Sequence, residues 1–446
     1  MVAVAIPSPT AHSQLDQAVQ RVKEGSRAFA KLSIEERIRL AEQMLDGYRQ
    51  VAEESVIAAC KAKGIDPQSP TAGEEWLAGP VVTVRLLRLT IEALREIQKF
   101  GQPRIDPSWV TTLPDGRISI KVFPHNSLDA MLLAKHTADV HMEAGVNLDN
   151  LKEHQASFYK KPHDGRLCLV LGAGNVNSIP PTDCITKMFN EGTTCVLKMN
   201  PVNAYVGPFI ERAFKPAIDR GFLAVVYGGA DEGSYLVNHA AVDEIHITGS
   251  DKTHDAMVWG PPGPDRDARK ARNEPLLKKA ISSELGNITP VIVVPGPYDD
   301  GELGFQADNI AGMVVNNASF NCNSAKLLIT GKEWQARGTL LERVERGLQK
   351  GVMRKAYYPG AEERWKAFTE GRKGLKLVGN PGPGELAYAM IPDVDPSNAS
   401  DRVFHQEPWC TVLSEMQVGS SDPKTFLEAA TAFCNDQLWG TLCATI

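Results

Sequence analysis

The sequence predicts an α/β protein built around a parallel sheet. Three short apolar runs support this prediction: Leu167–Leu171, Thr194–Leu197 and Phe222–Tyr227. A fourth run, Glu244–Thr248, alternates apolar and polar residues, and about one helix length separates each run from the next. Short apolar strands alternating with helices are typical of βαβ units whose sheet is covered on both faces. Because nucleotides bind at the carboxyl ends of such strands, this stretch indicates a dinucleotide-binding enzyme.

The composition is that of an ordinary globular protein. The 446 residues suffice for two or three domains, and the net charge of -6 argues against nucleic acid or an anionic membrane as a partner. The eight cysteines include no Cys-x-x-Cys pair, and no histidine cluster has metal-ligand spacing. We therefore expect free thiols and no metal. Without a recognisable signal peptide or a membrane-spanning apolar run, the expected location is the cytoplasm.

Helices are expected before the parallel sheet. The periodicity predicts helices over 12–62, with a capping box beginning at Ser33, and over 74–99. Residues 109–123 contain two alternating runs around a Pro-Asp-Gly turn, which is typical of a β-hairpin. Residues 126–157 are expected to be helix and loop.

A second αβ region is expected beyond the sheet. Proline, glycine and mixed charges predict an exposed loop at 259–275. Strand, helix, strand and helix are then expected in order at 291–294, 308–317, 327–330 and 333–349. Residues 356–400 are rich in proline and glycine and are expected to be mostly loop.

Six separated motifs follow one another along the second half of the chain. They are Gly174-Asn175-Val176, Glu191 to Lys198, Gly229 to Ser250, Ser283-Glu284-Leu285-Gly286, Asn321-Cys322 and Gln406-Glu407-Pro408-Trp409. Each motif alone is unspecific, and the Gly172-Ala173-Gly174 turn is as consistent with an ordinary glycine-rich turn as with a nucleotide site. In this order, the six motifs resemble the aldehyde dehydrogenase superfamily over roughly residues 160–446.

The resemblance implies the aldehyde dehydrogenase fold. That fold combines a Rossmann-like cofactor domain, an αβ catalytic domain and a β-hairpin oligomerisation arm. In this chain the N-terminal helices and the cofactor domain would occupy residues 1–280, with the arm at about 109–123. The catalytic domain would occupy residues 281–446. The resemblance also implies NAD or NADP as the cofactor, a small-molecule aldehyde as the substrate and a homo-oligomer.

Three catalytic residues are implied by the resemblance. Cys322 would be the nucleophile, because a thiolate adds readily to an aldehyde carbon. Asn175 would donate its amide to the oxyanion, together with the backbone N–H of Cys322. Glu284 would be a base, and its apolar neighbours Ile281 and Leu285 would strengthen that role. From the residues alone, the three are equally a buried thiol, a turn asparagine and a surface carboxylate.

Six further residues are implied to bind the cofactor: Gly174, Lys198, Gly249, Ser250, Glu407 and Trp409. Lys198 would hold the adenosine ribose or an adjacent phosphate, although an ordinary surface lysine would look the same. Gly249 and Ser250 would meet the pyrophosphate at a helix N-terminus. Glu407 would bind the nicotinamide ribose, with Trp409 in place of a phenylalanine of the family.

Several positions depart from the family pattern. Ser319 and Phe320 replace a Gly-Gln pair before the cysteine, and Asn287 replaces a second glycine after the glutamate motif. His254 replaces a glycine of the phosphate-facing helix, and Pro201 replaces a glutamate three residues after the lysine. These differences concern substrate shape and cofactor choice.

The last residues, Asn435–Leu442, resemble a family segment that precedes a strand and a long tail, whereas this chain ends at Ile446. We therefore expect a C-terminally truncated, divergent member of the superfamily. An unpaired hairpin and an incomplete catalytic sheet would then favour aggregation and low activity.

The expected function is NAD(P)-dependent oxidation of an aldehyde to the carboxylic acid through a thiohemiacetal and a thioester on Cys322. One alternative is an acylating aldehyde dehydrogenase, which passes the acyl group to the thiol of coenzyme A. Glu284 argues against it, because hydrolysis needs that base. Another alternative is a non-catalytic relative. Phe320 favours it, whereas the joint presence of Asn175, Glu284 and Cys322 opposes it.

Overall fold

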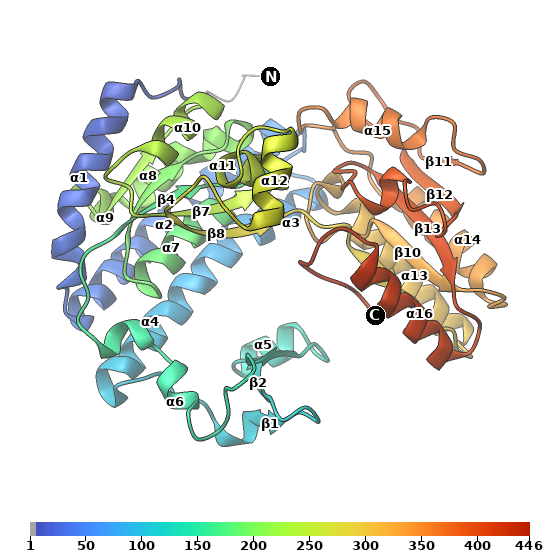
Figure 1. The fold of residues 1–446 in the computed structure, drawn as a ribbon, viewed down its shortest axis with the longest axis horizontal. Helices are drawn as coiled ribbons and strands as arrows, with labels where there is room; N and C mark the ends of the chain where they lie inside the picture. Colours follow the sequence, from blue (N-terminus) through green and yellow to red (C-terminus); the bar gives the residue numbers. More distant parts are fainter. Residues whose placement is uncertain (1–5) are drawn as a thin grey trace.

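The computed structural model describes residues 6–446, which form two α/β lobes and a smaller antiparallel sheet (Figure 1). The first lobe contains a five-stranded parallel sheet with the order β6-β5-β4-β7-β8. Its strands are β4 (Leu167–Leu171), β5 (Thr194–Lys198), β6 (Leu223–Val226), β7 (Glu244–Gly249) and β8 (Ala280–Leu285). The four predicted strands are confirmed, and β8 adds a fifth at the edge.

Helices cover both faces of this sheet (Figure 1). The helices of this lobe are α1 (His12–Ala30), α2 (Ile34–Lys63), α3 (Gly73–Trp76), α4 (Val82–Phe100), α7 (Ile179–Phe189), α8 (Gly207–Ala213), α9 (Lys215–Asp219), α10 (Ala230–Asn238), α11 (Asp251–Val258) and α12 (Pro264–Arg272). Alternate residues of a strand point to opposite faces, so Cys168 and Val170 pack with α2, α4 and α7. Leu167 and Leu169 pack with α1 and α10 on the other face. Both faces of the central strand, β4, are buried, which explains why all of its residues are apolar.

The capping box at the start of α2 is confirmed. The Glu36 N–H donates to Ser33 Oγ at 3.2 Å, and the Ser33 N–H donates to the Glu36 carboxylate at 2.8 Å. At the other end, Gly64 has a φ of 69°, a left-handed conformation that ends the helix. Lys63 is thus the last residue of α2.

The predicted hairpin is also confirmed. Strands β1 (Val110–Thr112) and β2 (Ile118–Phe123) pair antiparallel, and β3 (Ala138–His141) extends the sheet. Helices α5 (Ser127–Leu132) and α6 (Leu151–His154) flank β3 in the sequence. This strand corrects the expectation of helix and loop alone for 126–157. Figure 1 shows the small sheet standing apart from the two lobes.

The second lobe contains another five-stranded sheet with the order β11-β12-β13-β10-β9. Only β11 is antiparallel to its neighbour. The strands are β9 (Pro290–Ile292), β10 (Leu327–Gly331), β11 (Lys376–Val378), β12 (Tyr388–Val394) and β13 (Val412–Val418), and the helices are α13 (Asp300–Val315), α14 (Arg337–Lys350), α15 (Ala361–Thr369) and α16 (Pro423–Asp436). This arrangement confirms the second αβ region.

Two expectations about the second lobe are wrong in detail. Helix α13 begins at Asp300 and not at residue 308, because Asp299 caps it by accepting the Glu302 N–H at 2.8 Å. Residues 356–400 are not mostly loop, since they form α15, β11 and the largely buried β12. Their many prolines and glycines lie between these elements and not inside them.

The predicted exposed loop at 259–275 contains the helix α12. Its first residue is Pro264, a position where the missing N–H is not needed. Acidic residues stand in its first turn and basic residues in its last, an order that the helix dipole favours. No residue of α12 is buried, so the segment carries no apolar periodicity from which a helix could be predicted.

The first sheet ends at Leu285 and the second begins at Pro290. The predicted division into domains at residue 280 stays a prediction. Close to the end of the chain, Thr445 forms a parallel bridge with Val291 of β9.

Within residues 6–446, no helix is long and apolar enough to cross a membrane. In the same residues, no group of three or more His, Cys, Asp or Glu side chains could hold a metal ion.

Candidate active site

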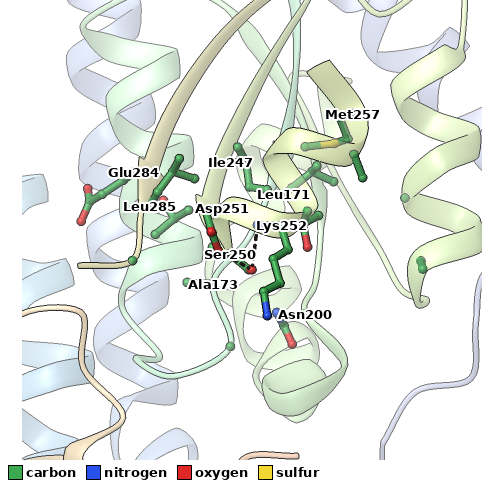
Figure 2. Close-up of a pocket in the computed structure, with 18 of the residues that line it drawn as sticks. Leu171, Ala173, Asn200, Ile247, Ser250, Asp251, Lys252, Met257, Glu284 and Leu285 are labelled. Atoms are coloured by element: carbon green, nitrogen blue, oxygen red, sulfur yellow. Dashed lines mark hydrogen bonds between the residues drawn. The ribbon is translucent and has the colours of Figure 1, made fainter. Parts of the chain in front are cut away.

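A cavity of about 1550 Å³ lies between the two lobes, beyond the carboxyl ends of β4, β5 and β7. All nine residues singled out in the sequence line it: Gly174, Asn175, Lys198, Gly249, Ser250, Glu284, Cys322, Glu407 and Trp409. Figure 2 shows part of its wall, with Ser250 and Lys252 near Asn200 and with Glu284 on the other side. Residues from six separate motifs are therefore brought to one place by the fold.

Cys322 lies between the short turn Asn316–Ser319 and β10, and its side chain is half-buried. Three consecutive residues of that turn, Asn317, Ala318 and Ser319, have φ values of 50°, 52° and 64°. The left-handed region costs a non-glycine residue about 1 kcal/mol or more. The turn that presents Cys322 is thus strained and is held in place by its surroundings.

The surroundings of Cys322 disfavour its thiolate. Burial, followed by the negative charges of Glu284 and Glu407, raises the pKa of the thiol to about 11. The backbone carbonyl of Cys322 accepts the Thr289 hydroxyl at 2.9 Å, which fixes the main chain. At neutral pH the Cys322 side chain is therefore a thiol, and a base would have to take its proton before it could act as a nucleophile.

Asn175 is buried in the loop that follows β4. Its Nδ2 donates to the carbonyl of Phe320 at 2.9 Å, two residues before the cysteine. An amide nitrogen carries two N–H groups, and this bond uses one of them. The second makes no hydrogen bond within residues 6–446, and Asn175 and Cys322 both line the cavity.

Glu284 does not lie in the apolar setting expected from its neighbours. Its side chain is exposed on β8, and it lines the open part of the cavity. The strand is at the edge of the sheet and four of its six residues are exposed, so Ile281 and Leu285 do not enclose the carboxylate. Glu284 is accessible to water, and its charge is one of those that act on Cys322.

Lys198 ends β5 and is buried. Burial lowers the pKa of its ammonium group to about 8, and the nearby Glu232 opposes that shift. Gly174, in the loop after β4, lies close to Asn200, in the loop after β5. A Cβ on Gly174 would lie 2.6 Å from Asn200 Oδ1. Any larger residue at position 174 would therefore displace Asn200 from the cavity wall.

Gly249 and Ser250 join β7 to α11. Ser250 caps this helix, since its Oγ accepts the Lys252 N–H at 3.1 Å. Ser250, Asp251, Lys252 and Thr253, at the N-terminal end of α11, line the cavity. The N-terminus of a helix favours anions.

Glu407 is largely buried beside Gly286. Burial raises the pKa of its carboxyl group to about 7, and Lys326 opposes that shift. Its Oε1 has no hydrogen-bond partner in the described chain, residues 6–446. Close by, Trp409 has a φ of 46°. Its ring packs edge-to-face with the ring of Tyr358, and the two ring centroids are 5.5 Å apart.

The sequence reasoning did not single out Tyr358, Arg364 and Trp439, although all three line the cavity. Arg364 donates to the carbonyls of Pro408 and Trp409, both at 3.2 Å, and so fixes the Glu407 loop. The adjacent tyrosines at 357–358, in a segment otherwise rich in proline and glycine, were a signal that could have identified Tyr358.

Solved structures share the fold over almost the whole chain. One is an NADP-dependent glyceraldehyde-3-phosphate dehydrogenase from Bacillus halodurans complexed with NADP, with a TM-score of 0.63 and 15% identity. The match covers 94% of this chain and 75% of that one. Another is a mutant of aldehyde dehydrogenase C from Pseudomonas syringae in complex with NAD+ and octanal, with a TM-score of 0.65 and 14% identity. It covers 97% of this chain and 78% of that one. At such identities, the likeness establishes the fold.

Among characterised sequences, an N-succinylglutamate 5-semialdehyde dehydrogenase from Novosphingobium aromaticivorans is 26% identical over 183 residues. That stretch covers 41% of this chain and only 35% of the relative. Residues 128–352, about half of the chain, match the aldehyde dehydrogenase family. The chain belongs to the aldehyde dehydrogenase family.

Proposed function

We propose that the protein oxidises an aldehyde to the corresponding carboxylic acid with NAD or NADP, and that Cys322 is its nucleophile. The observation that carries this proposal is the common cavity of Cys322, Asn175 and Glu284 at the carboxyl ends of the parallel strands. Parallel sheets bind nucleotides at this edge.

The residues present fit a nicotinamide dinucleotide. The N-terminus of α11 and the buried ammonium of Lys198 suit its phosphates and ribose. At the other end of the cavity, Glu407 has a buried carboxylate oxygen that makes no hydrogen bond within residues 6–446, which suits a ribose hydroxyl. When bound, the nicotinamide ring supplies the chemistry of accepting a hydride.

In the proposed mechanism, Cys322 Sγ adds to the aldehyde carbon after losing its proton to a base. The second N–H of Asn175 and the backbone N–H of Cys322 stabilise the resulting oxyanion. Departure of the hydride leaves a thioester on Cys322. Glu284, which is accessible to water, then takes a proton from the water molecule that hydrolyses the thioester. Aldehyde, oxidised cofactor and water thus become acid, reduced cofactor and a proton.

A panel of aldehydes tests the proposal. Each aldehyde is incubated with the protein and either NAD or NADP, and the absorbance of the reduced cofactor is followed while the acid is identified by mass spectrometry. We expect reduced cofactor and acid in equal amounts with at least one aldehyde. Release of reduced cofactor only when coenzyme A is added would assign the acylating reaction instead.

A further inference from the structure

A buried lysine outside all six motifs joins three separate parts of the active site. The Lys63 side chain is 3% exposed and pairs at 2.8 Å with Glu75, whose side chain is 2% exposed. Its Nζ also donates to the backbone carbonyl of Asn175 and to Oδ1 of Asn317, both at 3.1 Å. The three acceptors match the three N–H groups of an ammonium. They come from α3, from the loop after β4 and from the turn before Cys322.

Tyr357 and Asn317 complete this junction. The Tyr357 hydroxyl lies 3.1 Å from the Asn175 carbonyl and 2.9 Å from Asn317 Oδ1, so its one hydrogen serves one acceptor at a time. Asn317 Nδ2 donates to the same Asn175 carbonyl at 3.1 Å and to the Phe320 carbonyl at 3.3 Å. The carbonyl of Asn175 is therefore surrounded by three donors.

The junction acts on the two groups that must meet for the reaction. The main chain of Asn175 is fixed by the three donors, and its amide is fixed by the bond to Phe320. Asn317 is also the first of the three left-handed residues before Cys322. At the far end of that turn, Lys326 Nζ donates to the Ser319 carbonyl at 2.8 Å. The strained turn is thus held at both ends, and Lys63 ties one end to Asn175.

We propose that Lys63 is a positioning residue, which holds the Asn175 amide and the Cys322 sulfur in register across the two lobes. The inference rests on the proposed function, because it assumes that these two groups share one reaction. Misplacement of a reacting group by about 1 Å can lower a rate on the order of 100-fold. Loss of Lys63 should therefore lower turnover beyond its effect on stability.

The test compares two variants with two matched controls. Lys63→Met removes the ammonium, and Tyr357→Phe removes only one hydroxyl from the junction. Lys187→Met is the first control, since Lys187 is also buried and paired, with Glu191 at 2.7 Å, away from the cavity. Tyr388→Phe is the second, since its hydroxyl donates to the Val352 carbonyl at 2.9 Å outside the cavity.

For each protein we measure the melting temperature, kcat with a substrate aldehyde, the KM values for the aldehyde and for the cofactor, and the rate at which iodoacetamide alkylates Cys322 at pH 8. Peptide mass spectrometry assigns the alkylated cysteine. We expect Lys63→Met to lower kcat at least about tenfold with KM for the cofactor within threefold. Because the relaxed turn exposes the half-buried thiol, alkylation should become at least threefold faster. Tyr357→Phe should show both effects more weakly, and both controls should keep kcat and alkylation within twofold.

A fall in kcat no larger than that of Lys187→Met, or unchanged alkylation of Cys322 in both junction variants, would overturn the inference. If Lys63→Met does not fold, the inference is tested by comparing kcat and the alkylation rate of Tyr357→Phe with those of Tyr388→Phe. If the unmodified protein oxidises no aldehyde, the proposed function fails, whereas the alkylation rates still decide whether Lys63 positions the cysteine turn.

Discussion

Cys322 and Glu284 share one cavity but have opposite environments. Burial, followed by nearby negative charges, raises the pKa of the cysteine thiol and keeps it protonated at neutral pH, whereas the glutamate is exposed on an edge strand. An exposed carboxylate is accessible to the water that hydrolysis of a thioester requires. We therefore assign Glu284 to the hydrolysis of the thioester more than to the activation of the thiol.

Glu284→Gln should preserve the first half of the reaction and slow the second. The amide cannot accept the proton from water, so the thioester should accumulate on Cys322. Stopped-flow absorbance should show a burst of reduced cofactor of about one equivalent per active site, followed by turnover reduced about tenfold or more. Absence of both the burst and the slowing would exclude Glu284 as this base.

Glu407 should make stability depend on pH. Its folded pKa of about 7 lies above the value of 4.5 for an unperturbed glutamate, so its stabilising effect is fully present below about pH 4.5 and is lost as the pH rises through 7. From pH 5 to 8, the unfolding free energy should fall by about 1–3 kcal/mol relative to that of Glu407→Gln. Denaturant titrations at both pH values measure this difference. The same change in unfolding free energy from pH 5 to 8 in both proteins would contradict the raised pKa of Glu407.

At the scale of elements, the strands of the first sheet were predictable because each is a short apolar run between helix-length segments. Helix α12 was not, since it buries no residue and is specified by its end charges and Pro264. Likewise, the cavity residues follow from motifs, whereas the Lys63 junction does not. Lys63 and Asn317 are 254 positions apart, and only the packing of α2 against the cysteine turn brings them together.

The loop after β5 should permit NADP. Pro201 stands where the family pattern has a glutamate that would repel a 2′-phosphate, and Lys198 would attract that phosphate. Glu232, whose charge acts on Lys198, accepts the Gly229 N–H at 2.6 Å and is engaged in capping α10. Calorimetric titration should therefore give a Kd for NADP no weaker than that for NAD. Pro201→Glu should raise the Kd for NADP about tenfold or more. Binding of NAD with exclusion of NADP would contradict this account.

At the scale of the whole molecule, the two lobes enclose the cavity and the small sheet β1-β2-β3 stands apart from them (Figure 1). Within the described residues, β3 pairs only with β2, and α5 exposes Leu128, Met131 and Leu132. An apolar face beside an open strand edge is typical of a contact between subunits.

We predict a homo-oligomer in which a second copy covers α5. Size-exclusion chromatography with light scattering should give at least twice the chain mass, and Met131→Glu should shift the protein towards the monomer. Leu377→Glu is the control, because Leu377 is also apolar and exposed but lies on β11. A monomeric unmodified protein, or equal dissociation by both variants, would contradict the prediction.

The central claim, that Cys322 carries the aldehyde through oxidation, is tested most directly by the turnover of Cys322→Ser. A hydroxyl is a far weaker nucleophile than a thiolate, so dehydrogenase activity should fall on the order of 1000-fold or more while NADP binding stays within threefold. In the unmodified protein, intact-mass spectrometry of a quenched reaction should show one acyl group on Cys322. Turnover of Cys322→Ser at the rate of the unmodified protein, without any acyl adduct, would contradict the account.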